Sequence, residues 1–571
     1  MNHFVKSLGL VTLLGTVGYN GMAQTSAPAA IKQEGWHLKD LGADGIYGIS
    51  LQKAYDFLKT KNKTSNPVIV GVIDSGIDTT HEDLKPVLWK NLKEIPGNGI
   101  DDDGNGYIDD IYGWNFLGNK KGENVGKDSY EAARVYHKFK SKYEGVSVDT
   151  TKMNASEKYL YYSWVRAKDQ VLGGDSDISV DLFALRAAVN ATKASDSVLR
   201  DDMKKKEFTG NELKAYAPQT EAAKRAKAQL LYLFEANQMM DDKNTDFVQG
   251  FQAFLDSEEG KDKAKRMAPE EYRNKIVGDN YNDIKDIGYG NSDVMANTPF
   301  HGTHVSGIIA AVRNNGLGLD GVADNVSIMT LRAVPDGDEH DKDIALAIRY
   351  AVDNGAKVIN MSFGKSFSPE KHWVDDAVKY AADKGVLLVH AAGNDAKNVD
   401  IEHNYPKASL LNGEVAKNWI EVGASGDFSN GGVTARFSNY GKSVDVFAPG
   451  VRIYSTIPGG NTYGFANGTS MASPVVAGVA ALLMSYYPYL TAEQVKEIIE
   501  KSVVAPENTI NIPGTTDKTN LNTISKTGGV VNVYNAVVLA DTYPVPAGFN
   551  DKKPVKEKKQ KKEKKSKKKN K

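Results

Sequence analysis

The chain reads Gly468-Thr469-Ser470-Met471-Ala472-Ser473-Pro474, and residues 475–483 continue it with small apolar side chains. This pattern predicts a buried helix with Ser470 in its first turn, where backbone N–H groups are free and the helix dipole favours negative charge. A serine in that position can attack a carbonyl group, and the amides beside it can stabilise the resulting oxyanion. The motif alone is weak, because serine is also a common helix N-cap.

Two segments upstream supply partners for this serine. Residues 67–78 are rich in β-branched side chains and predict a buried parallel strand, with Asp74 at the carboxyl end where open α/β sheets bind ligands. Residues 300–311 predict another helix of small residues, with His301 at its start. An aspartate, a histidine and a serine therefore follow in that order, each at the edge of a predicted buried element.

These three segments resemble the motifs of the subtilisin-like serine proteases, the subtilases of peptidase family S8. The resemblance implies an α/β, three-layer fold with a mostly parallel central sheet. It also implies a secreted serine endopeptidase that works through an acyl-enzyme intermediate. In that mechanism Ser470 attacks the scissile carbonyl, His301 transfers the proton, and Asp74 orients the imidazole.

Two further segments extend the resemblance. Residues 386–394 end in a Gly-Asn turn, and Asn394 matches the family residue whose side-chain amide stabilises the oxyanion. Residues 358–364 match the extended segment that pairs with the substrate backbone and lines the first specificity pocket. The substrate-binding residues implied in this way are Ser362, Phe363, Gly364, Ala391 and Gly393.

Two alternatives to an active serine protease follow from the same residues. His301 and His304 share a helix face and leave a zinc hydrolase as the weaker enzyme alternative. The chain has no cysteine, and no acidic third ligand lies at helical spacing, so we expect His304 to be a packed histidine. A non-catalytic scaffold on the same fold would need a broken triad, and the motifs are intact. A processing protease that cuts few partners remains open.

Composition and periodicity agree with a large α/β protein. The 571 residues are 41% hydrophobic and include 53 glycines, which is enough for an extensive core. Strands and helices alternate, which predicts a parallel sheet covered on both faces. The expected strands are 327–332, 357–361, 386–391 and 419–424, and the expected helices are 341–354, 373–384 and 470–487.

The N-terminus predicts export. Residues 1–23 combine one lysine, an apolar stretch and small residues before a cleavage point, as in a secretory signal peptide. We see no other segment that predicts a membrane span. The mature chain is therefore expected to be secreted, periplasmic or associated with the cell envelope.

A calcium site is expected in an acidic, glycine-rich loop. Residues 101–110 place oxygen ligands as the first half of an EF-hand loop does, but the closing glutamate is missing. The predicted ligands are Asp101, Asp103, Asn105 and Tyr107, with Asp109 or Asp110 closing the site. The alternative is an acidic surface turn. Asp83 matches a family calcium ligand, and the loop at Asn314 and Asn315 could complete that second site.

The domain organisation departs from compact subtilases between the aspartate and the histidine. We expect the catalytic domain to occupy residues 24–117 and 278–545, interrupted by a mainly helical insertion at 118–277. The insertion contains apolar residues at helical spacing, such as Leu182, Leu185 and Val189. It is either a lid or platform that selects substrates, or a stabilising decoration.

The C-terminal residues 546–571 predict a disordered, lysine-rich tail. Residues 551–571 contain 13 lysines and 3 acidic residues, whereas the whole chain carries a net charge of −1. Such a tail is either a solvated end or a contact with anionic surfaces. Nucleic-acid recognition is not expected, because residues 551–571 have no aromatic side chain to stack on bases. The expected partners are protein or peptide substrates.

Overall fold

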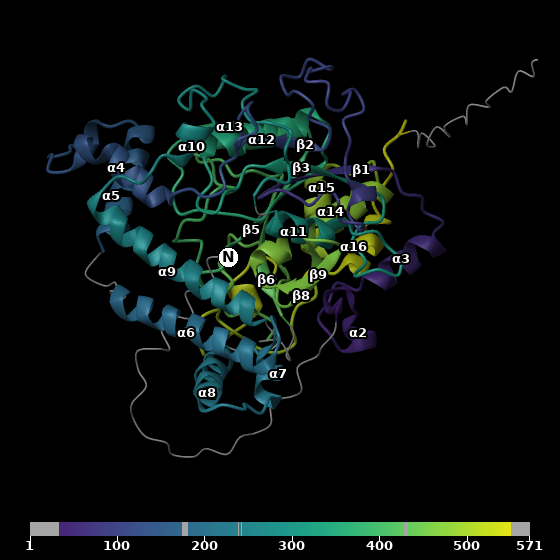
Figure 1. Ribbon diagram of the computed structural model, residues 1–571. Coiled ribbons are helices and arrows are strands. Elements are labelled where there is room, and N and C mark those ends of the chain that lie inside the picture. The colour runs from purple at the N-terminus through teal and green to yellow at the C-terminus, as the bar shows by residue number, and fades with distance from the viewer. Residues whose placement is uncertain are drawn as a thin grey trace, which may run out of the picture.

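The computed structural model describes residues 34–173, 181–237, 239–240, 243–297, 299–426 and 432–549. The predicted signal peptide and residues 550–571 of the predicted tail lie outside this part. A sheet of seven parallel strands forms the centre, in the order β2-β3-β1-β4-β5-β6-β7 (Figure 1). Its strands are β1 (Val68–Asp74), β2 (Gly113–Asn115), β3 (Val326–Arg332), β4 (Val358–Met361), β5 (Leu387–Ala391), β6 (Trp419–Ser425) and β7 (Val446–Pro449).

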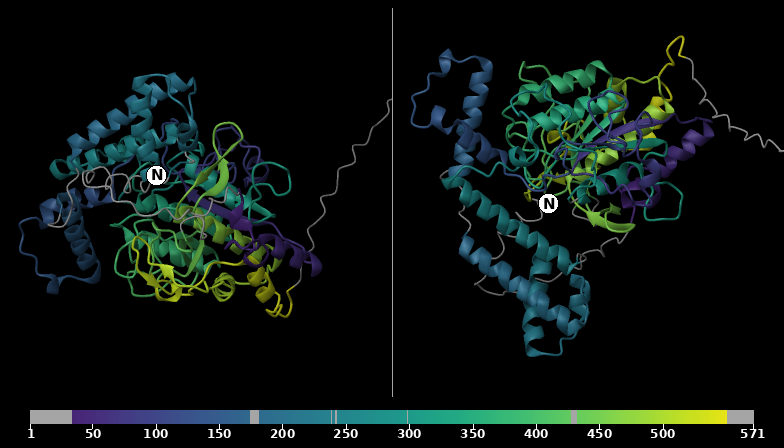
Figure 2. Two further views of the ribbon diagram at one scale, coloured as in Figure 1. Left: turned by 90° about the horizontal axis from the view of Figure 1, so that it is seen from below. Right: turned by 45° about the horizontal axis from the view of Figure 1, so that its top comes forward.

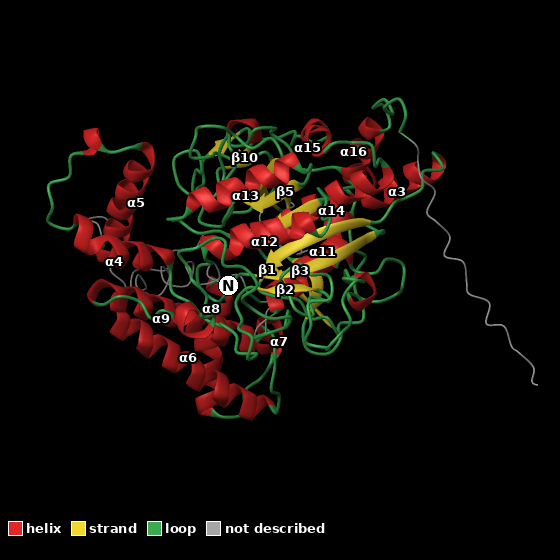
Figure 3. Cartoon of the chain, turned by 90° about the horizontal axis from the view of Figure 1, so that it is seen from above, coloured by secondary structure: helices red, strands yellow, loops and turns green. Residues whose placement is uncertain are grey.

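Helices cover both faces of this sheet (Figure 3). Successive side chains of a strand point to opposite faces, so Val70 and Val72 of β1 join one core while Ile69 and Ile73 pack in the other. The first core contains α11 (Phe300–Ala310) and α14 (Thr469–Tyr486), and the second contains α12 (Asp341–Asp353) and α13 (Lys371–Asp383). The predicted α/β, three-layer fold with a mostly parallel sheet is confirmed.

Small residues allow α11 and α14 to approach their neighbours closely. A Cβ on Gly302 would lie 2.2 Å from the carbonyl oxygen of Gly76, and one on Gly478 would lie 2.6 Å from Cβ of Val322. Both distances are below any normal contact, so no larger residue fits without moving the backbone. The small residues of these two helices therefore allow a close approach to the segments that follow β1 and precede β3.

The remaining elements surround this body. They are α2 (Leu41–Asp44), α3 (Leu51–Thr60), α15 (Ala492–Lys501), α16 (Val533–Ala540), the hairpin β8 (Ile453–Ile457) with β9 (Thr462–Ala466), and the pair β10 (Ile510–Asn511) with β11 (Lys518–Thr519). Short 3₁₀ helices lie at Trp36–Leu38, Lys85–Val87, Thr150–Lys152 and Leu521–Thr523. Residues of α3, α15 and α16 extend the core that contains α14.

The central sheet, with the helices and hairpins that surround it, is called the sheet body below. The segment between β2 and α11 is helical and lies on one side of the sheet body (Figures 1 and 2). Its helices are α4 (Glu131–Tyr143), α5 (Ala155–Leu172), α6 (Leu182–Met203), α7 (Gly210–Ala215), α8 (Glu221–Ala236), α9 (Asn244–Arg266) and α10 (Tyr272–Ile276). Helices α6 to α9 share one apolar core, whereas α4 and α5 form another that includes Phe367 of the sheet body. The insertion thus has two parts: an outer bundle, which contains α6 to α9, and an inner hairpin, which contains α4 and α5.

Both ends of the predicted insertion pack against the sheet body. Val125 and Val277 lie in the core that contains α12 and α13. Arg273 of α10 is buried and bonds to Asp343 of α12 through two contacts, of 2.9 and 2.7 Å. The part that projects from the body therefore begins at α4 and ends with α9.

Within the described part of the chain, one helix is long and apolar enough to cross a membrane. It is α14, and 89% of its most apolar window is buried inside the protein. Such burial is typical of the central helix of a globular core.

Candidate active site

Asp74 and His301 form the first contact of the site. Asp74 ends β1 at the carboxyl edge of the sheet, and only 2% of its side chain is exposed. His301 lies in the first turn of α11, where its Nδ1 is 2.8 Å from Oδ1 and 3.0 Å from Oδ2 of Asp74. The backbone N–H of Ser75 donates to Oδ1 over 2.7 Å and fixes the carboxylate. This arrangement keeps the proton on Nδ1 and leaves Nε2 as the basic nitrogen.

Ser470 lies in the first turn of α14 and is partly exposed. Among the described residues, its Oγ donates to the carbonyl oxygen of Ser362 over 3.0 Å instead of to His301. The hydroxyl of Ser362 donates in return to the carbonyl oxygen of Ser470 over 2.9 Å. His301 contacts Asp74 at the end of β1, and Ser470 contacts Ser362 just after the neighbouring parallel strand β4. The three residues of the predicted triad therefore lie at the same edge of the sheet.

Asn394 follows β5 and contacts the start of α14. Its Oδ1 accepts from the backbone N–H of Thr469 over 2.7 Å and from the Thr469 hydroxyl over 2.9 Å. These bonds orient the side chain, and its Nδ2 has no hydrogen-bond partner among the residues that the structure describes. A Cβ on Gly468 would lie 3.7 Å from that Nδ2, and Gly468 has a φ of +151° that side chains rarely adopt. A glycine before Thr469 therefore keeps this space open.

Asn439 supports the loop that carries Asn394, and the sequence motifs missed it. Its Oδ1 accepts from the backbone N–H groups of Asp395 and Lys397 over 3.0 and 2.9 Å. Its Nδ2 donates to the carbonyl oxygen of Ala392 over 2.8 Å. The residue lies far along the chain from the loop, and its local sequence is that of an ordinary turn. Only the folded structure links it to the site.

The predicted substrate-binding residues come from two segments that lie close together. Residues 362–364 follow the end of β4, while Ala391 ends β5 and Gly393 lies just beyond it. Asn404 fills the space between them: its Nδ2 donates to the carbonyl oxygen of Ala391 over 3.1 Å. A Cβ on Gly364 would lie 2.3 Å from Oδ1 of Asn404. Asn404 therefore narrows the space between the two predicted walls.

His304 lies one helical turn after His301 and is fully buried. Its Nε2 lies 3.1 Å from the carbonyl oxygens of both Ile453 and Gly464, and donates to them. Burial lowers the pKa of His304 to about 4, so the ring is neutral near pH 7. The ring thus attaches the β8–β9 hairpin to α11. Within the described ranges, the one cluster of three metal-ligating side chains contains neither histidine.

That cluster joins Glu94 to the acidic loop at residues 101–110. One carboxylate oxygen each of Glu94, Asp101 and Asp103 lies within 4.8 Å of the others. Glu94 also accepts from the backbone N–H groups of Asp102 and Asp109 over 2.8 and 3.1 Å. Glu94 lies outside the sequence motif, because all the predicted ligands, including Asp109 and Asp110 as the closing ones, lie within residues 101–110.

The other predicted ligands of this loop make different contacts. Asp109 accepts from the backbone N–H groups of residues 97–99. Asp110 is buried, which raises its pKa, and accepts from the Tyr350 hydroxyl over 2.5 Å. Asn105 donates to Asp110 over 2.9 Å, and its Oδ1 accepts from the Tyr107 N–H over 2.8 Å. The structure thus gathers Asp101 and Asp103 with Glu94 rather than with Asp109 or Asp110.

Asp83 lies in a separate, buried position. Its Oδ1 accepts from Nδ2 of Asn315 over 2.5 Å, and its Oδ2 accepts from the Tyr463 hydroxyl over 3.2 Å. Burial raises the pKa of the Asp83 carboxyl group. The loop at Asn314 and Asn315, predicted to complete a second site, therefore lies beside Asp83.

Known proteins similar to this chain are proteases. The thermophilic serine proteinase of Bacillus sp. strain AK1 is 47% identical over 186 residues, which cover 32% of this chain and 42% of that protein. Thermitase of Thermoactinomyces vulgaris is 41% identical over 196 residues, covering 34% and 64%. The cell wall-associated protease of Bacillus subtilis strain 168 is 39% identical over 228 residues, covering 40% and 22%. The matches thus span less than two thirds of each relative.

A solved structure of a protease from Pseudoalteromonas arctica PAMC 21717 aligns with a TM-score of 0.42 and 21% identity, over 88% of this chain and 96% of that one. The model of the subtilase family matches residues 65–530, which include the whole central sheet and both helices that carry His301 and Ser470. On the extent of that match, the chain belongs to the subtilase family.

Proposed function

We propose that the chain is a serine endopeptidase that hydrolyses peptide bonds through Asp74, His301 and Ser470. One observation carries the proposal: Nδ1 of His301 contacts both carboxylate oxygens of Asp74, and the helix of His301 packs against α14, whose first turn contains Ser470. Family membership supports the same activity. Each residue has a common structural role by itself, but the three together form the arrangement that activates a serine.

In the proposed mechanism, the Ser470 hydroxyl breaks its hydrogen bond to the Ser362 carbonyl oxygen and donates to Nε2 of His301 instead. His301 accepts the hydroxyl proton as the Ser470 oxygen bonds to the substrate carbonyl carbon, and then donates it to the leaving amine. Asp74 accepts from Nδ1–H and stabilises the imidazolium. Water, activated by the same histidine, then hydrolyses the acyl-enzyme and releases the second product.

The oxyanion formed in each step faces two donors in this proposal. They are the backbone N–H of Ser470, at the start of α14, and the side-chain Nδ2 of Asn394. The contacts of Oδ1 with Thr469 support this orientation of Asn394. One such donor contributes about 2.7–4 kcal/mol to lowering the barrier, because it meets charge that develops only in the transition state.

The substrate is an extended peptide in this proposal. Residues 362–364 pair with its backbone as an added strand, and the side chain before the scissile bond enters the space between Gly364 and Ala391. Because Asn404 occupies part of that space, we expect small side chains to be preferred there. Whether the enzyme is a general or a processing protease is tested by comparing unfolded casein with folded proteins.

A fluorophosphonate probe tests the proposed activity. It reacts only with an activated serine, so the wild-type chain should be labelled and Ser470→Ala should not. Ser473→Ala is a matched control on the same helix, since its hydroxyl is buried and bonds to Asn360. Failure to label the folded wild-type chain, with calcium present, would contradict the proposal.

We further propose that calcium stabilises the acidic loop through Glu94, Asp101 and Asp103. Carboxylate oxygens are the ligands that Ca²⁺ prefers, and three of them within 4.8 Å repel one another until a cation neutralises them. A second site at Asp83 rests on the family resemblance, with Asn315 beside it.

Thermal unfolding with calcium or with a chelator tests this proposal. The melting temperature of the wild-type chain should rise with calcium, and most of that rise should disappear in Glu94→Gln. Asp109→Asn is the matched control, because Asp109 caps residues 97–99 instead. Equal melting of the wild-type chain with and without calcium would rule the sites out.

We propose that the mature chain works outside the cytoplasm, after removal of residues 1–23. The name of the cell wall-associated protease supports this location by analogy. The lysine-rich tail, residues 546–571, would then contact anionic surfaces of the envelope. Fractionation of cells that express the full chain or a chain ending at residue 545 tests both points.

A further inference from the structure

The residue after the predicted substrate wall bonds to the insertion. Lys365 directly follows Gly364, and only 2% of its side chain is exposed. Its Nζ donates to Oε2 of Glu131 over 2.9 Å and to the carbonyl oxygen of Glu339 over 2.8 Å, and lies 2.8 Å from Oδ1 of Asp341. Glu131 belongs to the first turn of α4, whereas the other two partners belong to the sheet body.

The backbone of Lys365 also joins the two segments that form the predicted pocket. Its N–H donates to the carbonyl oxygen of Tyr405 over 3.0 Å, and the N–H of Tyr405 donates back over 2.8 Å. Tyr405 follows Asn404, which lies between Gly364 and Ala391. A shift of Lys365 would therefore move both the wall at residues 362–364 and the side chain that narrows the pocket.

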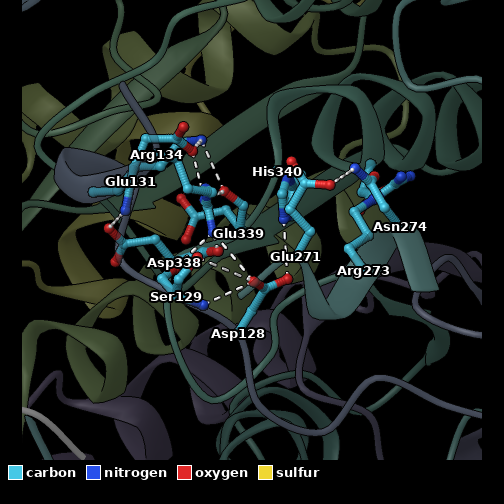
Figure 4. A network of polar contacts seen from close by, with 12 residues as sticks. Asp128, Ser129, Glu131, Arg134, Glu271, Arg273, Asn274, Asp338, Glu339 and His340 are labelled. Atoms are coloured by element: carbon cyan, nitrogen blue, oxygen red, sulfur yellow. Dashed lines mark hydrogen bonds and ion pairs between the residues drawn. The ribbon is translucent and has the colours of Figure 1, made fainter. Parts of the chain in front are cut away.

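Glu131 is itself rigidly placed (Figure 4). Its backbone N–H donates to the carboxylate of Asp338 over 2.7 Å, and its Oε2 accepts from Arg134 over 2.5 Å. Arg134 also donates to the carbonyl oxygen of Asp338 over 3.0 Å. Burial raises the pKa of Glu131, but Arg134 and Lys365 outweigh it, so the pKa lies well below its usual range. Glu131 is therefore charged where it meets Lys365.

Helix α5 adds contacts with the same segment. The hydroxyl of Tyr159 donates to the carbonyl oxygen of Ser368 over 2.9 Å. The guanidinium of Arg166 lies 4.9 Å from the centre of the Phe367 ring. The inner hairpin of the insertion, α4 and α5, thus covers residues 365–368 along their length.

We propose that Glu131 is a positioning residue for the substrate, which acts through Lys365 on the wall at residues 362–364. The inference rests on the proposed peptidase function. Peptide hydrolysis needs the scissile carbonyl aligned with Ser470, and a misplacement of about 1 Å can cost up to about 10²-fold in rate. The inner hairpin is then part of the substrate-binding apparatus, rather than a surface decoration.

Glu131→Gln tests the link, because it keeps the shape of the side chain and removes its charge. Lys138→Met is the matched control: Lys138 bonds from the same helix to Glu370, but its side chain is 44% exposed. Three kinds of measurement are made: steady-state kinetics (kcat and KM) on a peptide with four residues before the scissile bond, the rate of fluorophosphonate labelling, and hydrogen exchange of residues 362–371.

Glu131→Gln should lower kcat/KM for the peptide by about 10-fold, mainly through KM, since a small displacement weakens binding along the wall. Its labelling rate should stay within about twofold of wild type, because the probe does not need the wall. Exchange of residues 362–371 should be faster, and Lys138→Met should match wild type in all three.

Unchanged peptide kinetics and exchange in Glu131→Gln would overturn the inference, and so would an equal loss of peptide hydrolysis and labelling. A wild-type chain that is folded but not labelled would instead contradict the proposed function. If Glu131→Gln does not fold, the double variant Glu131→Gln/Lys365→Met tests the same link. It leaves Asp341 with its bonds to Ser368 and Glu370, and should show the same loss on the peptide.

Discussion

The sheet body and the outer bundle of the insertion pack with different kinds of side chain. Helices α11 and α14 use glycine, alanine and valine, and Gly302 leaves no room for a Cβ against Gly76. The bundle of α6, α8 and α9 packs with large rings, such as Phe234, Phe247 and Phe251. Small residues let neighbouring backbones come into direct contact, so the positions of the first turns of α11 and α14 are closely defined. A bundle of large side chains tolerates more variation.

The inner hairpin of the insertion, α4 and α5, meets the sheet body through charged side chains as well. Glu131 and Arg134 on the insertion side meet Lys365 and Asp338 of the body. The side chains of Glu131 and Lys365 are buried, and those of Arg134 and Asp338 are partly buried. Figure 4 shows how Glu131, Arg134 and Asp338 lie together. Buried ion pairs add little net stability, because desolvation opposes the attraction, but they require a defined geometry. Apolar packing thus stabilises each region, while charged contacts set how the inner hairpin meets the predicted substrate wall.

The strongest test of the body is Asp74→Asn. The amide cannot keep Nδ1 of His301 as the donor, so the imidazole loses its productive tautomer. We expect kcat for a peptide amide to fall by about 10⁴-fold, with the melting temperature changed little. Stopped assays at high enzyme concentration measure the residual rate. A loss below tenfold would show that Asp74 does not orient the base.

A smaller loss is expected from Asn394→Ala. Removing the proposed oxyanion donor should lower kcat by about 10²–10³-fold and leave KM nearly unchanged, because the donor meets charge only in the transition state. Steady-state kinetics on one peptide separate the two constants. Asn439→Ala, which removes the support of the same loop, should show a loss in kcat that is accompanied by lower thermal stability. A change confined to KM in Asn394→Ala would contradict the assigned role.

Asn404→Gly should change specificity more than rate. Without this side chain the space between Gly364 and Ala391 deepens, so peptides with an aromatic residue before the scissile bond should gain about 10-fold in kcat/KM relative to alanine. A paired set of peptides that differ only at that residue measures the ratio. An unchanged ratio would mean that Asn404 does not line the pocket.

The charged residues where the inner hairpin meets the sheet body predict a pH effect on stability. Burial raises the pKa of Glu339 from 4.5 to about 8, although Lys365 acts in the opposite direction. The folded state therefore keeps a proton that the unfolded chain releases, so this contribution to stability is present below pH 4.5 and is lost as the pH rises through 8. The slope is at most about 1.4 kcal/mol per pH unit.

Glu339→Gln removes this titration, since the amide is neutral at every pH. The variant should melt above the wild-type chain at pH 9 and near it at pH 4, and peptide hydrolysis at pH 7 should change little. Thermal unfolding across that range measures the effect. If the melting temperatures of the two proteins changed in parallel with pH, Glu339 would not titrate as stated.

Most of the fold of the sheet body could be predicted from its sequence, because each strand and helix there has its own local pattern of apolar residues. The expected helix at 341–354 is observed at Asp341–Asp353, and the expected strand at 327–332 at Val326–Arg332. The insertion is different: its helical content follows from periodicity, but the contact of Glu131 with Lys365 joins residues 234 positions apart. No local pattern records such a pairing, and the same is true of Asn439 and the loop of Asn394.

The acidic loop shows a related limit. The spacing of Asp101 and Asp103 predicts the first half of an EF-hand loop, closed by Asp109 or Asp110. The structure instead brings Glu94 back from the preceding segment, because its carboxylate caps the N–H groups of Asp102 and Asp109. Sequence spacing predicts ligands that lie within one turn, but not those that a bend in the chain returns to it.

Hydrolysis of one peptide amide by the wild-type chain and by Ser470→Ala, at equal concentration and with calcium present, tests the central claim most directly. The account predicts steady release of the amine by the wild-type chain and a loss of at least about 10⁴-fold in the variant, because the proposed acyl-enzyme forms on the Ser470 hydroxyl. Equal rates in the two proteins, or no hydrolysis by a folded wild-type chain that is free of inhibitor, would contradict the account.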